Sequence, residues 1–577
     1  MTADDINFGD PLMDDPDIAP PSIAAAAAAP PPRDDDDRPR PSQATKLVEL
    51  ALGAGVELWH TPTGDPHITV PLGGHREHHA LAGRAVREYL ARLHHTHTTR
   101  TPGSQAIADA LGTLAGMARY DGATHDVHVR VAGHHGAVYL DLGDPAWRAA
   151  EITAAGWRLV ADPPVRFRRG RALLALPEPM RGGAVDALRD VIHVASDDDW
   201  RLLVGWIVGA LRASGPYPLL ALDGEQGAGK STAARMLRRI VDPSGAELRA
   251  EPREIRDLMI AASGGWIVAL DNLSHIQPWL SDALCRVSTG GALSTRQLYT
   301  DGDEHIIEAI RPVLVTGIAS VVTRGDLADR TIAITLPTIP ESRRRPEADL
   351  WRAYDAIRPQ VLGVLLDAVA CALRRERDVR LDALPRMADW ALWVTAAEPA
   401  LGIEDGGILR AYAGSRQQAA EQTLDGDPLA VAIRALARPW EGTSAELLSR
   451  IAPAGRAPRG WPESPRGLSG ALRRLAPQLR RVGISVVLDR REPHTGRRLV
   501  AIEDMGARPS PPSPPSPGPD SLIFSGDGCP VAPSPTVTRP SPESPNDYAG
   551  GDDGDGGDGS TPAFDMEDSD DDNDYRS

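Results

Sequence analysis

A run of nine residues carries the clearest chemistry in this sequence. Its members are Gly224, Glu225, Gln226, Gly227, Ala228, Gly229, Lys230, Ser231 and Thr232. The first eight fit the pattern G-x-x-x-x-G-K-S/T, in which glycines let backbone N–H groups close around phosphate oxygens. In such a loop the lysine reaches the β- and γ-phosphates, and the hydroxyl of the next residue holds Mg²⁺. The pattern predicts a site for a nucleoside triphosphate with its magnesium ion.

Lysine is rare in this chain, which makes its place in the loop informative. Lysine and arginine together number 62, yet only Lys46 and Lys230 are lysines. A compact ammonium and a broad guanidinium are not interchangeable at a phosphate. The lysine at position 230 therefore favours a phosphate-binding loop over a glycine-rich turn that matches the pattern by chance.

Two further polar groups are expected beside the same phosphates. Residues 266–270 read as a buried strand that ends at Asp271, about 40 residues after the loop. The Asp271 carboxylate can hold Mg²⁺ there, directly or through water, and the alternative is an aspartate that caps a turn. Residues 311–317 read as another buried strand, and the polar group near its end is Thr316.

The loop needs a strand before it and a helix after it. Residues 217–222 are a short apolar run, and residues 232–240 read as a helix that Asp242-Pro243 stops. A fourth short apolar strand covers residues 331–336. Short apolar strands separated by helices predict a parallel, three-layer α/β core that binds ligands at the carboxyl ends of its strands.

Composition and periodicity divide the chain into six regions. Both ends are predicted to be disordered, because Pro, Ala, Asp, Ser and Gly replace regular apolar spacing there. The predicted regions are 1–42 disordered, 43–195 an N-terminal α+β domain of unknown role, 196–343 the nucleotide-binding core, 344–427 a helical lid, 428–504 a basic module and 505–577 a disordered acidic tail.

The region 43–195 holds 13 of the 16 histidines. They come without cysteines, and both a metal site and surface or packing roles are open for them. Asp141 and Asp144 are the nearest approach in this region to the paired carboxylates of a primase-type polymerase. No function is assigned to the region from its sequence.

The net charge of −18 is unevenly distributed. Residues 1–40 hold ten acidic and three basic residues, and residues 503–577 hold seventeen acidic and three basic residues. Residues 428–502, by contrast, hold fourteen arginines and five acidic residues. A basic module of this kind favours binding to the phosphates of nucleic acid.

Three helices followed by a basic hairpin predict a winged helix-turn-helix in residues 428–504. The third helix has leucines on one face and arginines on the opposite face, which suits phosphate and base contacts. Pro477 is expected to kink or end this helix. A solvated arginine face and a protein-binding face are the alternatives. The predicted DNA-binding residues of the module are Arg466, Arg473, Arg474, Arg480, Arg481, Arg497 and Arg498.

The sequence predicts a cytoplasmic protein. Its three cysteines are widely scattered, as expected in a reducing compartment. The alanine run at 24–29 has no basic segment before it and does not read as a signal peptide. The apolar run at 202–211 is too short to span a bilayer.

The segment between the second and third core strands carries a family resemblance. Residues 294–299 and 304–309 flank Asp301-Gly302, which is a hairpin signal. With residues 287–291 and Arg311-Pro312, they resemble the helicase half of phage and plasmid primase–helicase proteins, which are superfamily three helicases within the AAA+ ATPases. The resemblance covers about residues 197–502. The chain is also similar to ATP-binding proteins of actinobacterial mobile elements.

The resemblance implies a P-loop AAA+ fold and an ATP-hydrolysing DNA helicase that uses Mg²⁺. Its DNA would be single-stranded or forked, its assembly a homo-oligomeric ring, and a primase or another replication protein a candidate partner. By position, Lys230 and Ser231 would bind nucleotide and metal, and Asp271 would be the second acid. Two departures affect catalysis: Asn272 stands where a second carboxylate is common, and Thr316 stands where the polar sensor is usually asparagine.

The resemblance also implies three roles away from the loop. Arg330 would be a finger that reaches the ATP of a neighbouring subunit. Arg296 and Tyr299 would lie on a hairpin that faces DNA in the pore of the ring.

Two other functions remain open from the sequence. One is a regulatory or defence ATPase whose nucleotide state controls assembly and whose winged helix binds a partner. The other is a small-molecule kinase, which the glycine loop alone does not exclude. A kinase has no need of a basic helical module or of Arg330 in trans.

Overall fold

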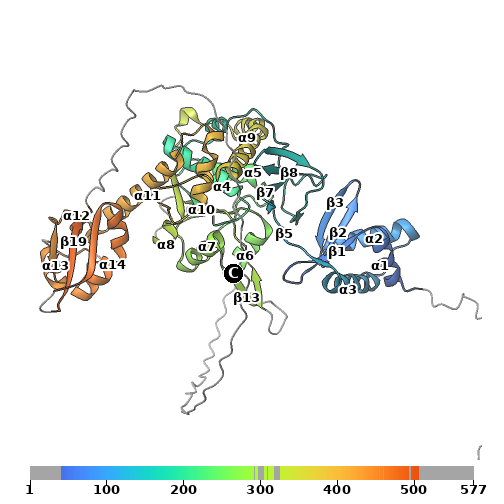
Figure 1. Cartoon of the computed structure of the whole chain (residues 1–577), viewed down its shortest axis with the longest axis horizontal. Helices are drawn as coiled ribbons and strands as arrows, with labels where there is room; N and C mark the ends of the chain where they lie inside the picture. Colours follow the sequence, from blue (N-terminus) through green and yellow to red (C-terminus); the bar gives the residue numbers. More distant parts are fainter. Residues whose placement is uncertain are drawn as a thin grey trace, which may run out of the picture. The chain divides into compact units, whose positions relative to one another are not determined.

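The computed structural model describes residues 41–291, 293–296, 304–307, 309–317, 325–453, 455–458, 460–492 and 496–505 (Figure 1). All of them belong to one compact unit, residues 1–506, and residues 507–577 are a separate unit. The predictions of disorder for residues 1–42 and 505–577 fall almost wholly outside the described ranges.

A parallel sheet lies at the centre of the nucleotide-binding region, as predicted. Its strand order is β12-β15-β11-β16, and every neighbouring pair is parallel. The strands are β11 (Leu219–Asp223), β12 (Val268–Leu273), β15 (Val313–Gly317) and β16 (Thr331–Thr335). Arg249 extends the sheet beside β12, because its N–H donates to Ala269 O and its carbonyl oxygen accepts from Asp271 N (3.0 and 2.8 Å). The carboxyl ends of these strands therefore share one edge of the sheet.

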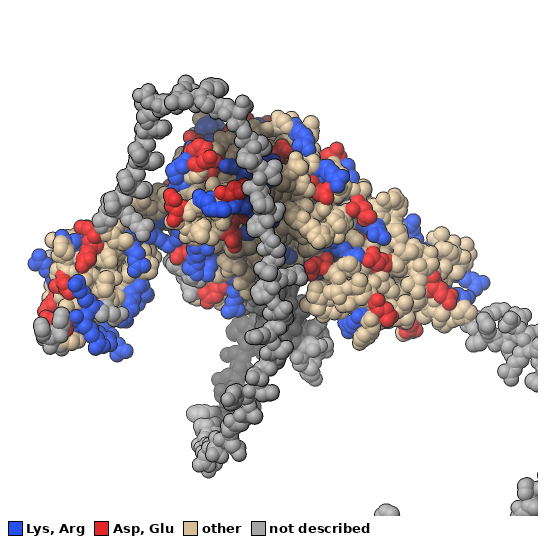
Figure 2. Space-filling model, in the orientation of Figure 1, with Lys and Arg blue, Asp and Glu red and all other residues tan. Residues whose placement is uncertain are grey.

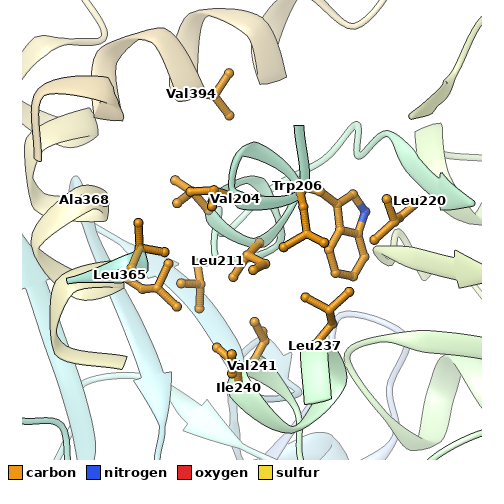
Figure 3. Close-up of a cluster of buried hydrophobic side chains, with 14 of the residues drawn as sticks. Val204, Trp206, Leu211, Leu220, Leu237, Ile240, Val241, Leu365, Ala368 and Val394 are labelled. Carbon is orange, nitrogen blue, oxygen red and sulfur yellow. The ribbon is translucent and has the colours of Figure 1, made fainter. Parts of the chain in front are cut away.

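Alternate residues of β11 enter two different hydrophobic clusters. Leu220 and Leu222 pack with helices α4 and α5, whereas Leu219 and Ala221 pack with helices α6 and α7. Figure 3 shows the first cluster, in which Trp206 lies beside Leu220. Side chains alternate along a strand, so an uninterrupted apolar strand needs helices on both faces of its sheet. The four helices are α4 (Asp197–Ala210), α5 (Lys230–Val241), α6 (Ile255–Gly264) and α7 (Pro278–Thr289).

The N-terminal region packs into two different cores. Residues 41–124 form a sheet of order β3-β2-β1-β4 with three helices, and they have a hydrophobic cluster of their own. The polar strand β3 was not predicted, because its sequence His-Arg-Glu-His-His has no apolar alternation. The elements are α1 (Gln43–Gly53), β1 (Glu57–His60), β2 (Pro66–Leu72), β3 (His75–Ala80), α2 (Arg84–Thr98), α3 (Ser104–Tyr120) and β4 (Ala123–Thr124).

Residues 125–195 pack on the nucleotide-binding core instead. They form an antiparallel sheet of order β6-β7-β8-β9, and the apolar side chains on one of its faces belong to the same cluster as those of α4 and α5. The hydrophobic core therefore continues across residue 195. The strands are β5 (Val127–His128), β6 (Val131–His134), β7 (Ala137–Asp141), β8 (Ala149–Thr153), β9 (Gly156–Val160) and β10 (Arg166–Phe167).

A fully buried arginine joins this second sheet to the end of α5. The Arg130 side chain is 0% exposed, and its Nε lies 3.1 Å from Asp242 Oδ1. Arg130 also donates to three backbone carbonyl oxygens, and Asp242 accepts from the N–H groups of Trp266 and Ile267. A buried ion pair is tolerated when its remaining polar atoms are hydrogen-bonded in this way. The contact anchors the C-terminal end of the helix whose other end carries the phosphate loop.

Three helices fill the region predicted to be a helical lid. They are α9 (Glu347–Arg375), α10 (Ala388–Ala397) and α11 (Gly407–Asp425). Among the described residues, α9 is the one helix long and apolar enough to cross a membrane by length and composition. However, 61% of its apolar window is buried inside the protein, which is the environment of a core helix. Tyr354 of α9 donates a hydrogen bond to Met236 O in α5, which ties the helical region to the phosphate-loop helix.

Residues 428–505 form a module of three helices and three strands. The strands are antiparallel in the order β17-β19-β18, and β17 was not predicted because it is only three residues long. All four leucines of the predicted stripe on α14 are buried in the core of the module. The elements are α12 (Pro428–Ala435), β17 (Trp440–Gly442), α13 (Ser444–Arg450), α14 (Pro465–Arg481), β18 (Ile484–Arg491) and β19 (Arg498–Asp504).

Helix α14 continues through Pro477 to Arg481, so Pro477 does not end it. A proline within a helix removes one backbone hydrogen bond, and the buried leucines of α14 lie on both sides of Pro477 in the core of the module.

Candidate functional site

The glycines of the phosphate loop occupy positions that other residues tolerate poorly. Gly224, Gly227 and Gly229 have φ values of 151°, 87° and 74°, all in the region that favours glycine. A Cβ on Gly224 would lie 2.7 Å from the carbonyl oxygen of Leu336. The loop thus turns sharply between β11 and α5 and presents backbone N–H groups at the start of the helix. This is the geometry of an anion-binding cradle.

Lys230 is the first residue of α5 and lies over its own loop. Its Nζ donates to the carbonyl oxygens of Gly224 and Glu225, both at 2.8 Å. The side chain is only partly buried, so the ammonium can exchange these carbonyl oxygens for phosphate oxygens. The lysine is therefore placed where the loop pattern requires it.

Three predicted site residues meet at the carboxyl edge of the sheet. The hydroxyl groups of Ser231 and Thr316 both donate to Asp271 Oδ1, at 2.9 and 2.6 Å. Asp271 and Thr316 reach this point from the adjacent parallel strands β12 and β15, and Ser231 reaches it from α5. A hydroxyl and a carboxylate at this spacing are the protein ligands that Mg²⁺ takes when phosphates supply other positions.

Thr316 has a structural partner on each side. Its hydroxyl proton is committed to Asp271, and its oxygen accepts the N–H of Asn272 at 2.9 Å. Asn272 has a φ of 57°, a left-handed conformation that asparagine tolerates. Thr316 is buried to 1% exposure. These contacts make it an orienting partner for the carboxylate of Asp271.

Replacing Thr316 by valine should therefore weaken the use of Mg²⁺ more than the binding of free nucleotide. Valine keeps the shape and removes the hydroxyl, and loss of a partner that orients a metal ligand typically costs about tenfold or more in affinity or activity. Titration of ATPase activity with Mg²⁺ measures the effect. Thr316→Ser is the matched control and should retain wild-type behaviour. Equal Mg²⁺ dependence in the valine variant and the wild type would contradict this role.

A basic segment beyond β16 lies over the phosphate loop and was missed in the sequence. The Nη2 of Arg344 is 3.7 Å from the position of a Cβ on Gly227, and Thr338 donates to Glu225 Oε2 at 3.2 Å. Arg344 is thus a candidate second cation beside the phosphates. The available signal was the run of three arginines at 343–345, which follows the last core strand after a short connection.

Arg330 lies at the other end of the sheet from the loop. It precedes β16, and its carbonyl oxygen accepts from Leu219 N at the start of β11 (2.9 Å). Its Nη1 lies 3.7 Å from Cys285 Sγ on α7. The phosphate loop follows the opposite end of β11, so Arg330 is separated from the loop of its own chain by the length of a strand. Arg330 is therefore not placed to contact a ligand in the loop of its own chain.

The predicted hairpin is present, although its tip lies outside the described residues. Strands β13 (Leu293–Arg296) and β14 (Glu304–Ile307) are antiparallel and pair Arg296 with Glu304. Arg296 is the last described residue of the first strand, and Tyr299 falls in the segment that is not described.

The arginines predicted to bind DNA divide into two groups. In the C-terminal module, Arg481 forms an ion pair with Asp329 in the turn before β16 and is 29% exposed. The other predicted DNA-binding arginines of the module are exposed, and they are Arg466, Arg473, Arg474, Arg480, Arg497 and Arg498. Figure 2 shows basic side chains on the surface of this module.

The histidines of the N-terminal region take part in packing and ion pairs. His67 stacks on the buried Trp59 at 4.6 Å between ring centroids. Burial, reinforced by the charge of Arg166, lowers the pKa of His78 to about 3, so this ring is neutral at physiological pH. Within the described part of the chain, no group of three or more His, Cys, Asp or Glu side chains is arranged to hold a metal.

The two aspartates considered as a polymerase pair are held by arginines. Arg169 binds both carboxylate oxygens of Asp141 at 2.6 and 3.0 Å, and Arg148 binds Asp144 at 2.6 Å. Asp141 is also 1% exposed. These carboxylates stabilise the second sheet, and the geometry gives them no open face for a metal.

Comparisons with known proteins place the site in context. The C-terminal region of NrS-1 is 12% identical, with a TM-score of 0.37, over 79% of this chain and 98% of that chain. SCCmec type IV Cch, described as an active helicase, is 12% identical, with a TM-score of 0.44, over 78% of this chain and 92% of that chain. No curated protein matches the sequence.

Two family models match the chain on either side of the junction between the core and the C-terminal module. The model for the actinomycete integrative conjugative element replication protein, RepA, matches residues 185–420. The model for the C-terminal domain of the same RepA proteins matches residues 429–516. Together they cover the parallel sheet, the phosphate loop, the helical region and the basic module. The chain belongs to the family of actinomycete integrative conjugative element replication proteins.

Proposed function

We propose that this replication protein is an ATP-driven DNA helicase or translocase. The observation that carries the proposal is the convergence of Lys230, Ser231, Asp271 and Thr316 at the carboxyl edge of a parallel sheet. The loop binds the phosphate chain through backbone N–H groups and the ammonium of Lys230. The residues present fit a phosphate chain, because three glycines of the loop have positive φ values and Lys230 stands at the amino end of α5.

The proposed fold is the P-loop AAA+ arrangement. In support, β11 of the four-stranded sheet precedes the loop and Asp271 is carried by the strand two places away, with Thr316 on the strand between. Hydrophobic clusters on the two faces of the sheet support a three-layer core. Ser231 and Asp271 would hold Mg²⁺, which neutralises charge on the phosphates during transfer to water.

We infer a homo-oligomeric ring from the position of Arg330. Arg330 lies at the amino end of the strands, far from the phosphate loop of its own chain. In the proposed ring, each subunit supplies its Arg330 to the ATP of the next subunit. In such a ring the hairpin formed by β13 and β14 would face the central pore, and Arg296 and Tyr299 would contact DNA there. A primase or another replication protein would be a partner on the same template.

The C-terminal module would be the second DNA contact. Its order of helix, short strand, two helices and two longer strands supports a winged helix-turn-helix in which α14 would be the recognition helix. The leucine stripe is buried and the arginines on the opposite face are exposed, which suits phosphate contacts.

The deciding experiment measures the ATPase rate of the full chain with and without single-stranded DNA. A helicase or translocase should turn over ATP faster when DNA is present, and forked DNA should be unwound. A rate that DNA leaves unchanged, together with no unwinding, would reject the helicase function while leaving nucleotide binding intact.

The acidic tail is predicted to compete with DNA for the basic module. Residues 506–577 hold fifteen acidic and three basic residues. The last described residue before them, Met505, donates its N–H to Gly483 O at 2.7 Å, just after the end of α14. The alternative is a tail that only aids solubility or recruits another protein.

Truncation after Met505 keeps all of β19 and should tighten DNA binding about fivefold to tenfold at low salt, since a tethered competitor acts at high effective concentration. The gain should shrink as salt screens the charges. A tail of equal length with its acids changed to amides is the control and should behave like the truncation. Equal affinity of full-length and truncated chains at low salt would show that the tail does not compete.

A further inference from the structure

The residue directly before Arg330 is bound by arginines from three different elements. Asp329 lies in the turn between α8 (Gly325–Ala328) and β16, and its side chain is 25% exposed. Arg481 of α14 and Arg416 of α11 contact its Oδ1, the latter at 3.5 Å, and Arg386 contacts its Oδ2 at 3.6 Å. None of these contacts was anticipated from the sequence, because the four residues are far apart in it.

The backbone at Asp329 is tied down as well. The hydroxyl of Tyr412 donates to Asp329 O at 3.5 Å, and Arg330 N donates to Leu327 O at 3.0 Å. The guanidinium of Arg416 lies 5.4 Å from the centroid of the Tyr412 ring. Burial raises the pKa of Tyr412, so its phenol stays a neutral hydrogen-bond donor. The carbonyl and carboxylate of one residue thus connect the start of β16 to the helical region and to the C-terminal module.

The contact from Arg481 crosses between two parts of the protein. Arg481 is the last residue of α14, whose leucines form the core of the basic module. Leu424 near the end of α11 belongs to the same hydrophobic core. The module is therefore attached to the ATPase region through α11. Arg481 adds a polar contact with Asp329, the residue that precedes Arg330 in the chain.

We propose that Asp329 is a positioning residue for Arg330 and that Arg481 makes this positioning depend on the docked C-terminal module. The inference rests on the proposed function, in which Arg330 acts on the ATP of the next subunit. A catalytic group must be held within a fraction of an ångström, and the residue adjoining Arg330 is held from three sides. The basic module would then have two separable roles, one in DNA binding and one in ATP turnover.

Charge explains why Asp329 should matter more than a single surface ion pair. An isolated exposed pair contributes little, because water screens it and the side chains lose freedom. Here one carboxylate lies among three guanidinium groups, with a fourth on the next residue. Removing the carboxylate breaks the contacts with Arg386, Arg416 and Arg481 together, so the turn that carries Arg330 loses its anchor.

The first test is Asp329→Asn, which keeps the size of the side chain and removes its charge. ATP turnover without DNA should fall about tenfold, while the affinity for a fluorescent ATP analogue stays at the wild-type value. Mixing Asp329→Asn with Lys230→Ala subunits should restore turnover, because the second variant supplies a well-placed Arg330 to an intact loop. A general folding defect would weaken analogue binding and would not be restored by mixing.

The second test compares Arg481→Ala with Arg450→Ala, an exchange of an exposed arginine at the end of α13 in the same module. Only Arg481→Ala should lower turnover in the absence of DNA, by about threefold, and Arg481→Lys should recover part of the loss. Combining Arg481→Ala with Asp329→Asn should lower turnover no further than Asp329→Asn alone.

The outcomes separate this inference from the proposed function. If Arg330→Ala keeps full turnover, the finger assignment itself fails. If Arg330→Ala loses turnover while Asp329→Asn and Arg481→Ala do not, the finger stands and the positioning role of Asp329 is overturned. If Arg481→Ala and the wild type turn over ATP at the same rate without DNA, the C-terminal module does not help to position Arg330.

Discussion

Replacing Lys230 by alanine is expected to abolish ATP turnover. The ammonium lies 2.8 Å from two carbonyl oxygens of the loop and is the lysine of the phosphate cradle. Charge that develops on the phosphates during transfer is stabilised by such preorganised cations, and loss of one typically costs about a hundredfold or more. Steady-state ATPase assays and binding of a labelled ATP analogue to the purified variant measure the effect.

The chain offers a matched control for this exchange. Lys46 is its other lysine and lies exposed on α1, far along the sequence from the loop. Lys46→Ala should turn over ATP like the wild type. Lys230→Arg should also be impaired, since a planar guanidinium does not fit a cradle shaped for an ammonium. If Lys230→Ala turns over ATP at the wild-type rate, this loop is not the nucleotide-binding site.

Replacing Arg330 by alanine is expected to leave nucleotide binding intact and to abolish turnover. Arg330 lies at the end of β16 opposite to the loop, so it does not help its own chain to hold ATP. An arginine finger supplied by a neighbour typically contributes about a thousandfold or more to the rate. Binding of the ATP analogue and the ATPase rate should therefore separate in this variant.

Mixing variants distinguishes action in trans from action within one chain. Arg330→Ala subunits have an intact loop, and Lys230→Ala subunits have an intact finger. Mixed interfaces should regain activity that neither variant shows alone. An ATPase rate per subunit that does not depend on protein concentration, combined with a monomer by sedimentation, would refute the ring. Mixing Lys46→Ala with Arg330→Ala controls for dilution, because the former contributes wild-type sites and fingers.

The local chemistry of the nucleotide site could be predicted because each part of it is encoded by a few neighbouring residues. The loop pattern, the helix after it and the apolar runs before Asp271 and Thr316 are short-range features. Parallel strands bring such strand ends to one edge, so the pattern also anticipated that Asp271 would lie near Ser231. The two residues are indeed 2.9 Å apart at their oxygens.

Other elements were set by periodicity over one helix or strand. The leucine stripe of α14 is buried as predicted, and β13 and β14 of the predicted hairpin pair in antiparallel register. Strands β3 and β17 were missed because one is polar and the other is three residues long. Their pairing is determined by the neighbouring strands and not by their own composition.

The sequence by itself determined the phosphate-binding loop, the order of helices and strands around it and the segregation of charge, since these depend on residues adjacent along the chain. Tertiary structure alone decided which polar groups meet. In the folded chain the Thr316 hydroxyl donates to Asp271, Arg344 lies beside the loop, and one hydrophobic core extends across residue 195. Arg481 also contacts Asp329, which is 152 positions away in the sequence. Contacts of this kind depend on how whole elements pack, and no spacing pattern within one element encodes them.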